Sequence, residues 1–238
     1  MAGMLDLGKQ TITKQRDDSY KRWFDISVLV IMHLVLLPLW VMLWTLIPIV
    51  IWLGDRGPVF YRQQRAGKQG RVITVLKFRT MIPNADRIGP AWTMERDPRV
   101  TRFGRILRRT ALDELPEIIS ILKGDMSLVG PRALDVGEHT MLQEEIPGFE
   151  ERLRVLPGLT GPAQIYDRTD DANDKFRYDL GYLEEMSPWL DVRLLILSVW
   201  NTLGARWDRR EGKILMVTAD PAQSNEDAQN QEPISKDP

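Results

Sequence analysis

Residues 26–53 read ISVLVIMHLVLLPLWVMLWTLIPIVIWL, and this uncharged stretch decides the fold. It is longer than the ~20 apolar residues that a helix needs to cross a bilayer. A secretory signal peptide fits less well, because its apolar region is typically about 7–15 residues long and precedes a small-residue cleavage site. A buried helix of a soluble core fits poorly too, since Trp40, Trp44 and Trp52 lie among many Leu, Ile and Val with no polar face. We therefore predict a membrane segment.

The path of this segment depends on its prolines and its flanks. Pro38 should interrupt the helix, because it lacks an amide donor and clashes with the carbonyl of Leu34, and Pro48 predicts a second break. Basic residues flank both ends, which favours a cytoplasmic position for each end. A re-entrant helix bent at Pro38 satisfies both flanks, whereas a straight crossing leaves one of them outside. The residues alone leave both paths open. The flanking residues are Lys14, Arg16, Lys21 and Arg22 before the run and Arg56, Arg62, Arg65, Lys68 and Arg71 after it.

The overall composition excludes several classes of function. The chain has 32 basic and 33 acidic side chains, so no global positive field favours nucleic acid and we predict no nucleic-acid partner. It has no cysteine, which excludes disulfides, thiolate catalysis and zinc-thiolate sites and suits a cytosol-facing protein. Its two histidines exclude a histidine-rich metal site.

The remainder of the chain predicts a mixture of short strands and helices. Residues 157–162 hold two prolines and two glycines, which predicts an irregular loop. The polar composition after Lys213 predicts a disordered tail. The last predicted helix is apolar and flanked by tryptophans, so it either lies on a membrane surface or packs into the core. The predicted strands are 57–62 and 72–78, and the predicted helices are 100–109, 115–122, 174–186 and 189–207, the last two separated at Ser187-Pro188.

The most informative polar stretch sets Asp113 and Glu114 between a basic cluster that includes Arg108 and the predicted helix at Pro116. Pro116 suits a first helical turn and places Asp113 near the N-cap. Capping alone explains the acidic residues but leaves the arginines unexplained. Alternatively, the helix N-terminus and the arginines form a site for a diphosphate and keep Asp113 ionised. An ionised Asp113 is then a nucleophile for phosphorus, and Glu114 is a candidate ligand for Mg²⁺.

Three further cations are candidates for the same pocket. Arg132 follows a Gly-Pro turn and can hold a phosphate in bidentate fashion, although an isolated surface arginine more commonly forms an ion pair. Lys77 and Arg79 follow a predicted strand and are candidates for binding the substrate phosphates, together with Thr80. Because Lys77 and Arg79 share a strand face, a simple solvated pair is the alternative.

Taken together, these residues resemble the bacterial sugar transferase family. These are the monotopic phosphoglycosyl transferases that start capsule, exopolysaccharide, O-antigen and glycoprotein glycan synthesis. The resemblance covers most of residues 21–207, and the chain is similar to the minimal catalytic form, without the extra N-terminal transmembrane bundle of longer relatives. Its landmarks are Lys21-Arg22 with Asp25, Gly57-Pro58-Val59-Phe60, Lys77-Phe78-Arg79-Thr80-Met81, Asp113-Glu114-Leu115-Pro116, Ser127-Leu128-Val129-Gly130-Pro131-Arg132 and Pro157-Gly158-Leu159-Thr160-Gly161.

The resemblance implies an undecaprenyl-phosphate sugar phosphotransferase with a ping-pong reaction. Asp113 would attack a UDP-sugar, release UMP and carry the phosphosugar until polyprenyl phosphate takes it. Glu114 would bind Mg²⁺, while Arg108 and Arg132 would bind phosphate. The enzyme would lie in the bacterial inner membrane, with its catalytic domain facing the cytoplasm and in contact with membrane lipid. A homodimer stays open.

The implied fold class is α+β, with a re-entrant membrane helix, a small and mostly helical catalytic domain, and interfacial amphipathic helices. We divide the chain into a cytoplasmic segment 1–19, the membrane helix-break-helix 20–54, the catalytic domain 55–212 and the tail 213–238. Two departures from the family pattern concern Leu37-Pro38, where Ser-Pro is common, and Pro131-Arg132-Ala133, where Pro-Arg-Pro is common. The first affects the bend angle, and the second should loosen the turn that holds Arg132.

Two other functions compete with this interpretation. An inactive, membrane-tethered scaffold for glycan assembly would keep the anchor without turnover, but the acidic pair and both arginines are intact. A hydrolase acting through an aspartyl phosphate would use the same nucleophile without needing a lipid acceptor.

Overall fold

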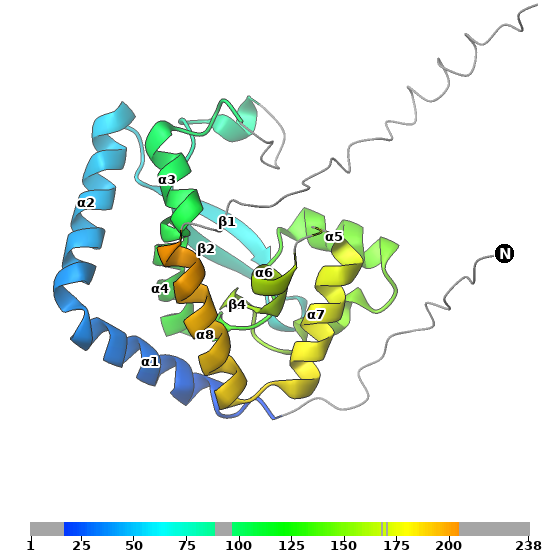
Figure 1. Cartoon of the computed structure of the whole chain (residues 1–238). Coiled ribbons are helices and arrows are strands. Elements are labelled where there is room, and N and C mark those ends of the chain that lie inside the picture. Colours follow the sequence, from blue (N-terminus) through cyan, green and yellow to red (C-terminus); the bar gives the residue numbers. More distant parts are fainter. Residues whose placement is uncertain (1–16, 89–96, 168, 170, 205–238) are drawn as a thin grey trace, which may run out of the picture.

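The computed structural model describes residues 17–88, 97–167, 169 and 171–204 (Figure 1). Helices predominate in this part of the chain, beside two small sheets, so the predicted mixed content is confirmed. The α-helices are α1 (Lys21–Val35), α2 (Leu37–Asp55), α3 (Arg102–Thr110), α4 (Ile118–Lys123), α5 (Val136–Glu145), α6 (Pro162–Tyr166), α7 (Ala172–Glu185) and α8 (Pro188–Leu203). The 3-10 helices are η1 (Lys68–Gly70), η2 (Ala85–Arg87), η3 (Leu112–Glu117) and η4 (Phe149–Arg154), and the strands are β1 (Phe60–Ala66), β2 (Val72–Phe78), β3 (Ser127–Val129) and β4 (Gly158–Thr160).

The long apolar stretch forms two helices that meet at Leu36, whose φ of −109° and ψ of 23° interrupt the helical path. Pro38 lies in the first turn of α2, where its missing amide costs no helical hydrogen bond. The predicted break at Pro48 is wrong, because α2 continues through it. Ile47 and Ile51 on either side of Pro48 are buried against the domain, which holds this part of the helix in place.

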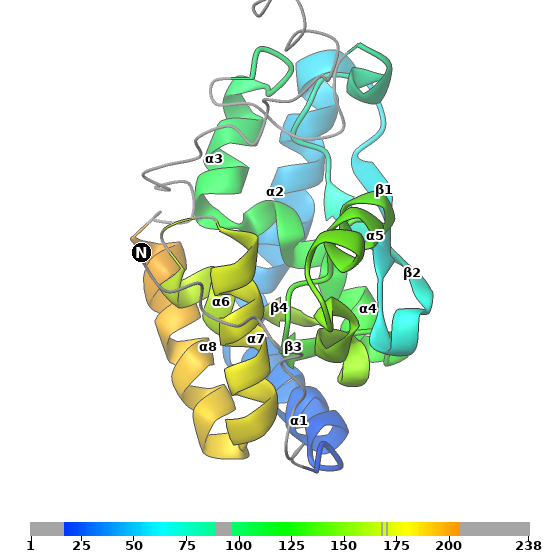
Figure 2. The ribbon, with the colours of Figure 1, turned by 90° about the vertical axis from the view of Figure 1, so that its right-hand side faces the viewer.

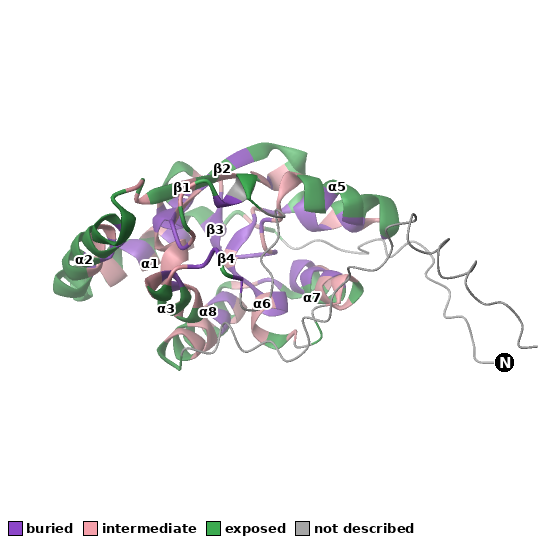
Figure 3. Ribbon diagram, turned by 90° about the horizontal axis from the view of Figure 1, so that it is seen from above, coloured by how far each residue is buried: buried purple, intermediate pink, exposed green. Residues whose placement is uncertain are grey.

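Of the described helices, α2 alone is long and apolar enough to cross a membrane, with a mean hydropathy of 2.0. Only 17% of the same window is buried. Figure 3 shows most of α2 exposed, whereas the buried residues gather around β3 and β4. The apolar surface of α2 is therefore left for an apolar environment.

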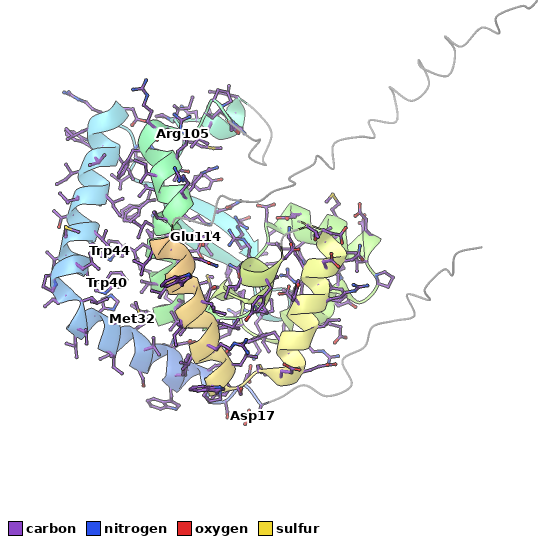
Figure 4. The ribbon with its side chains drawn as sticks, in the orientation of Figure 1. Asp17, Met32, Trp40, Trp44, Arg105 and Glu114 are labelled. Atoms are coloured by element: carbon purple, nitrogen blue, oxygen red, sulfur yellow. The ribbon has the colours of Figure 1, made fainter. Side chains whose placement is uncertain are left out.

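The two apolar helices diverge from their bend and both pack on the same domain (Figure 1). Leu29 of α1 and Trp40 of α2 join the main core with Ile121 of α4. Farther along α2, Ile47 packs in a second cluster with Leu107 of α3. Figure 4 shows Met32, Trp40 and Trp44 on the inner side of the bend. The inner faces of both helices thus belong to the core.

The two sheets are each built from a pair of strands. Strands β1 and β2 form an antiparallel hairpin, and β2 spans the residues predicted for it. Strands β3 and β4 are parallel, which corrects the prediction that residues 157–162 are an irregular loop. A side chain at Gly158 would place its Cβ 2.1 Å from the backbone nitrogen of Gly130. The glycines of this stretch therefore allow two backbones to pack closely.

Most helix boundaries follow the sequence signals. Thr101 caps α3 by accepting a hydrogen bond from the amide of Gly104 at 2.9 Å, and Gly124 ends α4 in the left-handed conformation with φ of 87°. Ser187 separates α7 from α8 as predicted and caps α8. Helix α8 ends at Leu203 with Gly204 as its C-cap, before the predicted end at 207. Residues 205–207 and the predicted disordered tail lie outside the described residues.

Helix α8 is buried on one face and exposed on the other. Asp191 and Leu194 are fully buried, which confirms packing into the core. Trp189 and Trp200 are 79% and 62% exposed on the same helix. Figure 2 shows α8 in line with α3, and the two helices are in contact.

Candidate functional site

The acidic pair lies in the 3-10 helix η3, between α3 and α4. Helix α3 ends at Thr110, and Ala111 takes a left-handed conformation with φ of 53° that redirects the chain into η3. The N-cap is therefore Ala111, and Asp113 lies in the first turn, near the N-cap as predicted; the alternative in which Asp113 itself caps the helix is wrong. The Asp113 carboxylate is consequently not used to cap this helix.

Glu114 is the centre of a cluster of charges drawn from three parts of the chain. Its Oε1 accepts a hydrogen bond from Lys77 Nζ of β2 at 2.7 Å and another from Arg132 Nη2, after β3, at 2.8 Å. Lys77 Nζ also lies 3.2 Å from Oε1 of Glu117. Figure 4 shows Glu114 near the middle of the molecule, at the inner end of α3.

These charges face a small recess that is open to solvent at Arg132. The side chain of Arg132 is 34% exposed, against 13% for Lys77 and 14% for Glu114. Counting Arg65, the lining carries three cations and two carboxylates, so an incoming anion would be attracted. The lining residues are Arg65, Val75, Lys77, Glu114, Glu117, Met126, Arg132, Ala133 and Gly158.

Three backbone hydrogen-bond acceptors hold the turn that presents Arg132. The carbonyl of Pro131 accepts from the amide of Gly158 at 2.8 Å, that of Arg132 accepts from Arg152 at 2.9 Å, and that of Ala133 accepts from Arg65 at 2.8 Å. These contacts restrain the turn, which we expected to be looser because Ala133 stands where proline is common.

Arg152 is itself fixed by an ion pair. It lies 2.6 Å from Asp179 of α7, and the two side chains are 3% and 1% exposed. Arg152 therefore links the backbone of Arg132 to helix α7.

The two adjacent carboxyl groups have opposite pKa shifts. Burial and the neighbouring charge of Glu114 raise the pKa of Asp113, against the opposing charges of Lys77 and Arg108. Burial also acts to raise the pKa of Glu114, but Arg132 and Lys77 outweigh it and hold that pKa well below its usual range. Glu114 is thus a fixed anion, whereas ionised Asp113 is the more basic and more nucleophilic of the two.

The electrostatic environment of Asp113 differs from the one we expected. We predicted that a helix N-terminus would favour its ionised form. The backbone amide of Asp113 in the first turn does favour the ionised form, as do Lys77 and Arg108, but burial and Glu114 outweigh them and raise the pKa.

The remaining predicted residues divide into two groups. Arg108 Nε donates to the hydroxyl of buried Thr80 at 2.8 Å, which fixes Arg108 near Asp113. Arg79 instead pairs with Asp55 at the end of α2 and is not part of the lining of the recess. Lys77 and Arg79 do not form the solvated pair given as the alternative, because Lys77 contacts Glu114 and Arg79 contacts Asp55. Phosphate binding by Arg79 stays a prediction.

Sequence reasoning missed Glu117 and Arg65. Glu117 follows Glu114 by three residues, which is one turn of a 3-10 helix, so both carboxylates reach Lys77. That spacing was a usable signal once η3 was known to be a 3-10 helix. Arg65 gave no local signal, because its contact with Ala133 joins residues far apart in the sequence.

The described residues could bind Mg²⁺ only if substrate phosphates supplied further ligands. In the described part of the chain there is no group of three or more His, Asp or Glu side chains suited to a metal ion. Mg²⁺ commonly binds through one or two carboxylates, with phosphates and waters completing its shell. Glu114 fits this pattern because its low pKa keeps it ionised, although Lys77 and Arg132 already contact its Oε1.

A carboxylate pair among lysine and arginine, on a domain that carries two apolar helices, is typical of a site for anionic groups. Residues 16–205 match the family model described as "Bacterial sugar transferase". The chain belongs to this family, as the sequence motifs predicted.

Individual relatives agree with this assignment. One is "UDP-glucose:undecaprenyl-phosphate glucose-1-phosphate transferase" of Escherichia coli (strain K12), 40% identical over 65% of this chain and 35% of its own. Another is "UDP-N-acetylgalactosamine-undecaprenyl-phosphate N-acetylgalactosaminephosphotransferase" of Aeromonas hydrophila, 36% identical over 78% of this chain and 45% of its own. "Exopolysaccharide production protein PSS" of Rhizobium leguminosarum bv. phaseoli is 39% identical over 77% of this chain and 94% of its own. The chain thus spans less than half of the first two relatives and nearly all of the third.

Proposed function

We propose that this protein transfers a sugar phosphate from a UDP-sugar to polyprenyl phosphate, such as undecaprenyl phosphate, and releases UMP. This reaction would begin the synthesis of a bacterial glycan. The observation that carries the proposal is Asp113, with its raised pKa, beside a recess in which Lys77 and Arg132 share Glu114. The names of the relatives, which specify UDP-sugars and undecaprenyl phosphate, support the same reaction.

The reaction proceeds in two displacements at one phosphorus atom. A carboxylate oxygen of Asp113 attacks the sugar-bearing phosphorus, and the bond to the bridging oxygen breaks so that UMP leaves with the electron pair. A phosphate oxygen of the lipid then attacks the same phosphorus and breaks the bond to Asp113. The carboxylate is restored, and the product is a polyprenyl diphosphate sugar.

The basic residues would bind the substrate charges. Arg132, the most exposed of the cluster, would meet the donor diphosphate first, and Lys77 and Arg108 would contact it deeper in the site. Bound Mg²⁺, held by Glu114 and phosphate oxygens, would screen the repulsion between anionic nucleophile and anionic substrate. Glu117 would keep Lys77 oriented toward the recess.

We further propose that α1 and α2 enter the inner membrane from the cytoplasmic side and return to it. The break at Leu36 supports this path, as do the basic flanks at both ends. Both helices also pack on one domain. A straight crossing would instead put the start of α1 and the end of α2 on opposite sides of the bilayer. The catalytic domain would then face the cytoplasm, with α3 and α8 at the lipid surface.

Product analysis of the purified protein in nanodiscs tests the reaction. A panel of UDP-sugars with Mg²⁺ is offered with and without undecaprenyl phosphate, and UMP is measured. We expect turnover that depends on the acceptor and, without acceptor, release of one UMP per protein together with a covalent phosphosugar on Asp113. Intact-mass measurement after acid quenching detects this adduct.

The variant Asp113→Asn should lose both UMP release and the adduct, whereas the surface control Asp174→Asn should keep them. Continued turnover in Asp113→Asn would refute the nucleophile. Steady UMP release without acceptor would favour the hydrolase, and no release with any donor would favour the scaffold.

A further inference from the structure

Helix α3 presents one stripe of exposed residues that the proposed reaction does not use. Arg102, Arg105, Ile106 and Arg109 are exposed, and they follow each other at the spacing of one helical face. The opposite face of the helix packs through Leu107 against α2. The stripe therefore sets three guanidinium groups around an apolar side chain that is 57% exposed.

Within the described residues, the side chains of Arg102, Arg105 and Arg109 make no hydrogen bond or ion pair. The neighbouring acids are already engaged, since Asp55 pairs with Arg79 and Asp97 pairs with Arg99. The formal charge of the whole chain is only −1, so this stripe is a local excess of positive charge. A face of this kind attracts an anionic surface.

The position of the stripe identifies that surface. Figures 1 and 2 show α3 and α8 in line, between the outer ends of α1 and α2. Helix α8 exposes Val199, Trp200 and Leu203, the last two being 62% and 78% exposed. Arginines beside exposed tryptophan and aliphatic side chains are typical of helices at the boundary between lipid headgroups and acyl chains.

We infer that the arginine stripe of α3, formed by Arg102, Arg105 and Arg109, binds the headgroups of anionic phospholipids. The inference rests on the proposed insertion of α1 and α2, which sets α3 at headgroup level. Apolar insertion holds the protein in any bilayer, and the arginine stripe adds a preference for negatively charged lipid. An effect on the order of fivefold is expected for each arginine near such a surface.

Lipid selectivity measured by electron paramagnetic resonance tests this inference without using turnover. The full chain is reconstituted in phosphatidylcholine bilayers containing a trace of spin-labelled phosphatidylglycerol or spin-labelled phosphatidylcholine. The fraction of motionally restricted label gives the relative association of each lipid. Wild type should prefer phosphatidylglycerol by roughly fivefold or more at low salt, and the preference should fall as salt screens the charges.

Two multiple variants separate the stripe from general charge. R102Q/R105Q/R109Q should lower the preference several-fold, whereas R154Q/R177Q, which removes two exposed arginines outside the stripe and the basic flanks, should keep it. An undiminished preference in the first variant overturns the inference. So does loss of the wild-type preference on adding inorganic phosphate at constant ionic strength, which would identify a site for soluble anions.

The lipid measurement also stands apart from the proposed chemistry. Asp113→Asn should show the wild-type lipid preference even though it releases no UMP. If restricted lipid of either kind is absent with wild type, the membrane insertion itself is refuted, whatever the result of the UMP assay.

Discussion

Two clusters of buried charge, one around Glu114 and one around Asp191, have similar contacts but different roles. In the recess, Lys77 and Arg132 contact Glu114 at 2.7 and 2.8 Å. Near the start of α1, Lys21 contacts Asp191 of α8 at 2.8 Å. By distance alone, the two clusters are alike.

Their surroundings differ. Asp191 has no exposed surface, and its two oxygens accept from Tyr182 at 2.7 Å and from Tyr20 at 2.8 Å in addition to Lys21. Lys21 also donates to the carbonyl of Val129 at 2.6 Å, so this cluster is closed. In the recess, by contrast, two cations share one oxygen of Glu114, and solvent reaches Arg132. A closed cluster joins elements of the fold, and an open cluster with surplus positive charge is available to a substrate.

The largest expected effect is the loss of Lys21. Lys21→Met should lower the free energy of unfolding by about 3–5 kcal/mol, because it leaves the Asp191 carboxylate buried without its cation. Thermal and denaturant unfolding in detergent, followed by tryptophan fluorescence, measure the change. Lys68→Met is the matched control, since the Lys68–Asp18 pair is 34% and 30% exposed and should be worth less than about 1 kcal/mol. Equal losses in the two variants would show that burial does not distinguish these pairs.

The reverse pattern is expected for Glu114. Glu114→Gln should reduce turnover by roughly 100- to 1,000-fold, the range for removal of one electrostatic contact in an active site. Its free energy of unfolding should fall by less than that of Lys21→Met. The low pKa of Glu114 means that its carboxylate stabilises the fold at pH 7, but Arg132 is partly exposed and water can solvate it in the variant. Steady-state UMP release and unfolding are measured on the same preparations, with exposed Glu138→Gln as control. A stability loss as large as that of Lys21→Met would mean that the recess is a structural cluster too.

The sequence predicted best those features whose cause is local. The apolar run and Pro38 predicted the interrupted pair of helices, and a run of β-branched residues located β2. The predicted helix 115–122 stops one residue short of the end of α4, where Gly124 takes the left-handed conformation that glycine readily adopts. Each of these signals lies within a few residues of the feature that it produces.

Features that depend on distant residues were missed or predicted incorrectly. Parallel pairing of β3 with β4 joins segments about thirty residues apart, so the glycines around Gly158 suggested only a loop. Arg79 was predicted in the recess, but Asp55 at the end of α2 pairs with it. The acidic pair was located from its sequence motif. Lys77 and Arg132 were only candidates for the same pocket, because β2, η3 and the turn after β3 come together only in the folded chain.

The smallest expected effect concerns the proposed nucleophile, Asp113. Its carboxyl group should be required for turnover but should lower the stability of the fold at pH 7. Because the folded protein raises the pKa of Asp113, the group stabilises the fold below its unfolded pKa and loses that contribution as pH rises through its folded pKa. At pH 7 the carboxylate is therefore a cost to the fold. Asp113→Asn should be more stable than wild type at pH 7 by about 1 kcal/mol while having no turnover.

Thermal unfolding in detergent across a pH series, without nucleotide or Mg²⁺, measures this difference. The advantage of Asp113→Asn should shrink as pH falls through the folded pKa of Asp113, because wild type then carries a neutral group as well. Asp125→Asn, where the carboxyl lies outside the recess, should show no such pH-dependent gain. A lower stability of Asp113→Asn at pH 7 would mean that Lys77 and Arg108 outweigh burial and Glu114. The carboxylate would then be held by its cations as Asp191 is, and the contrast between the open and closed clusters would not extend to the nucleophile.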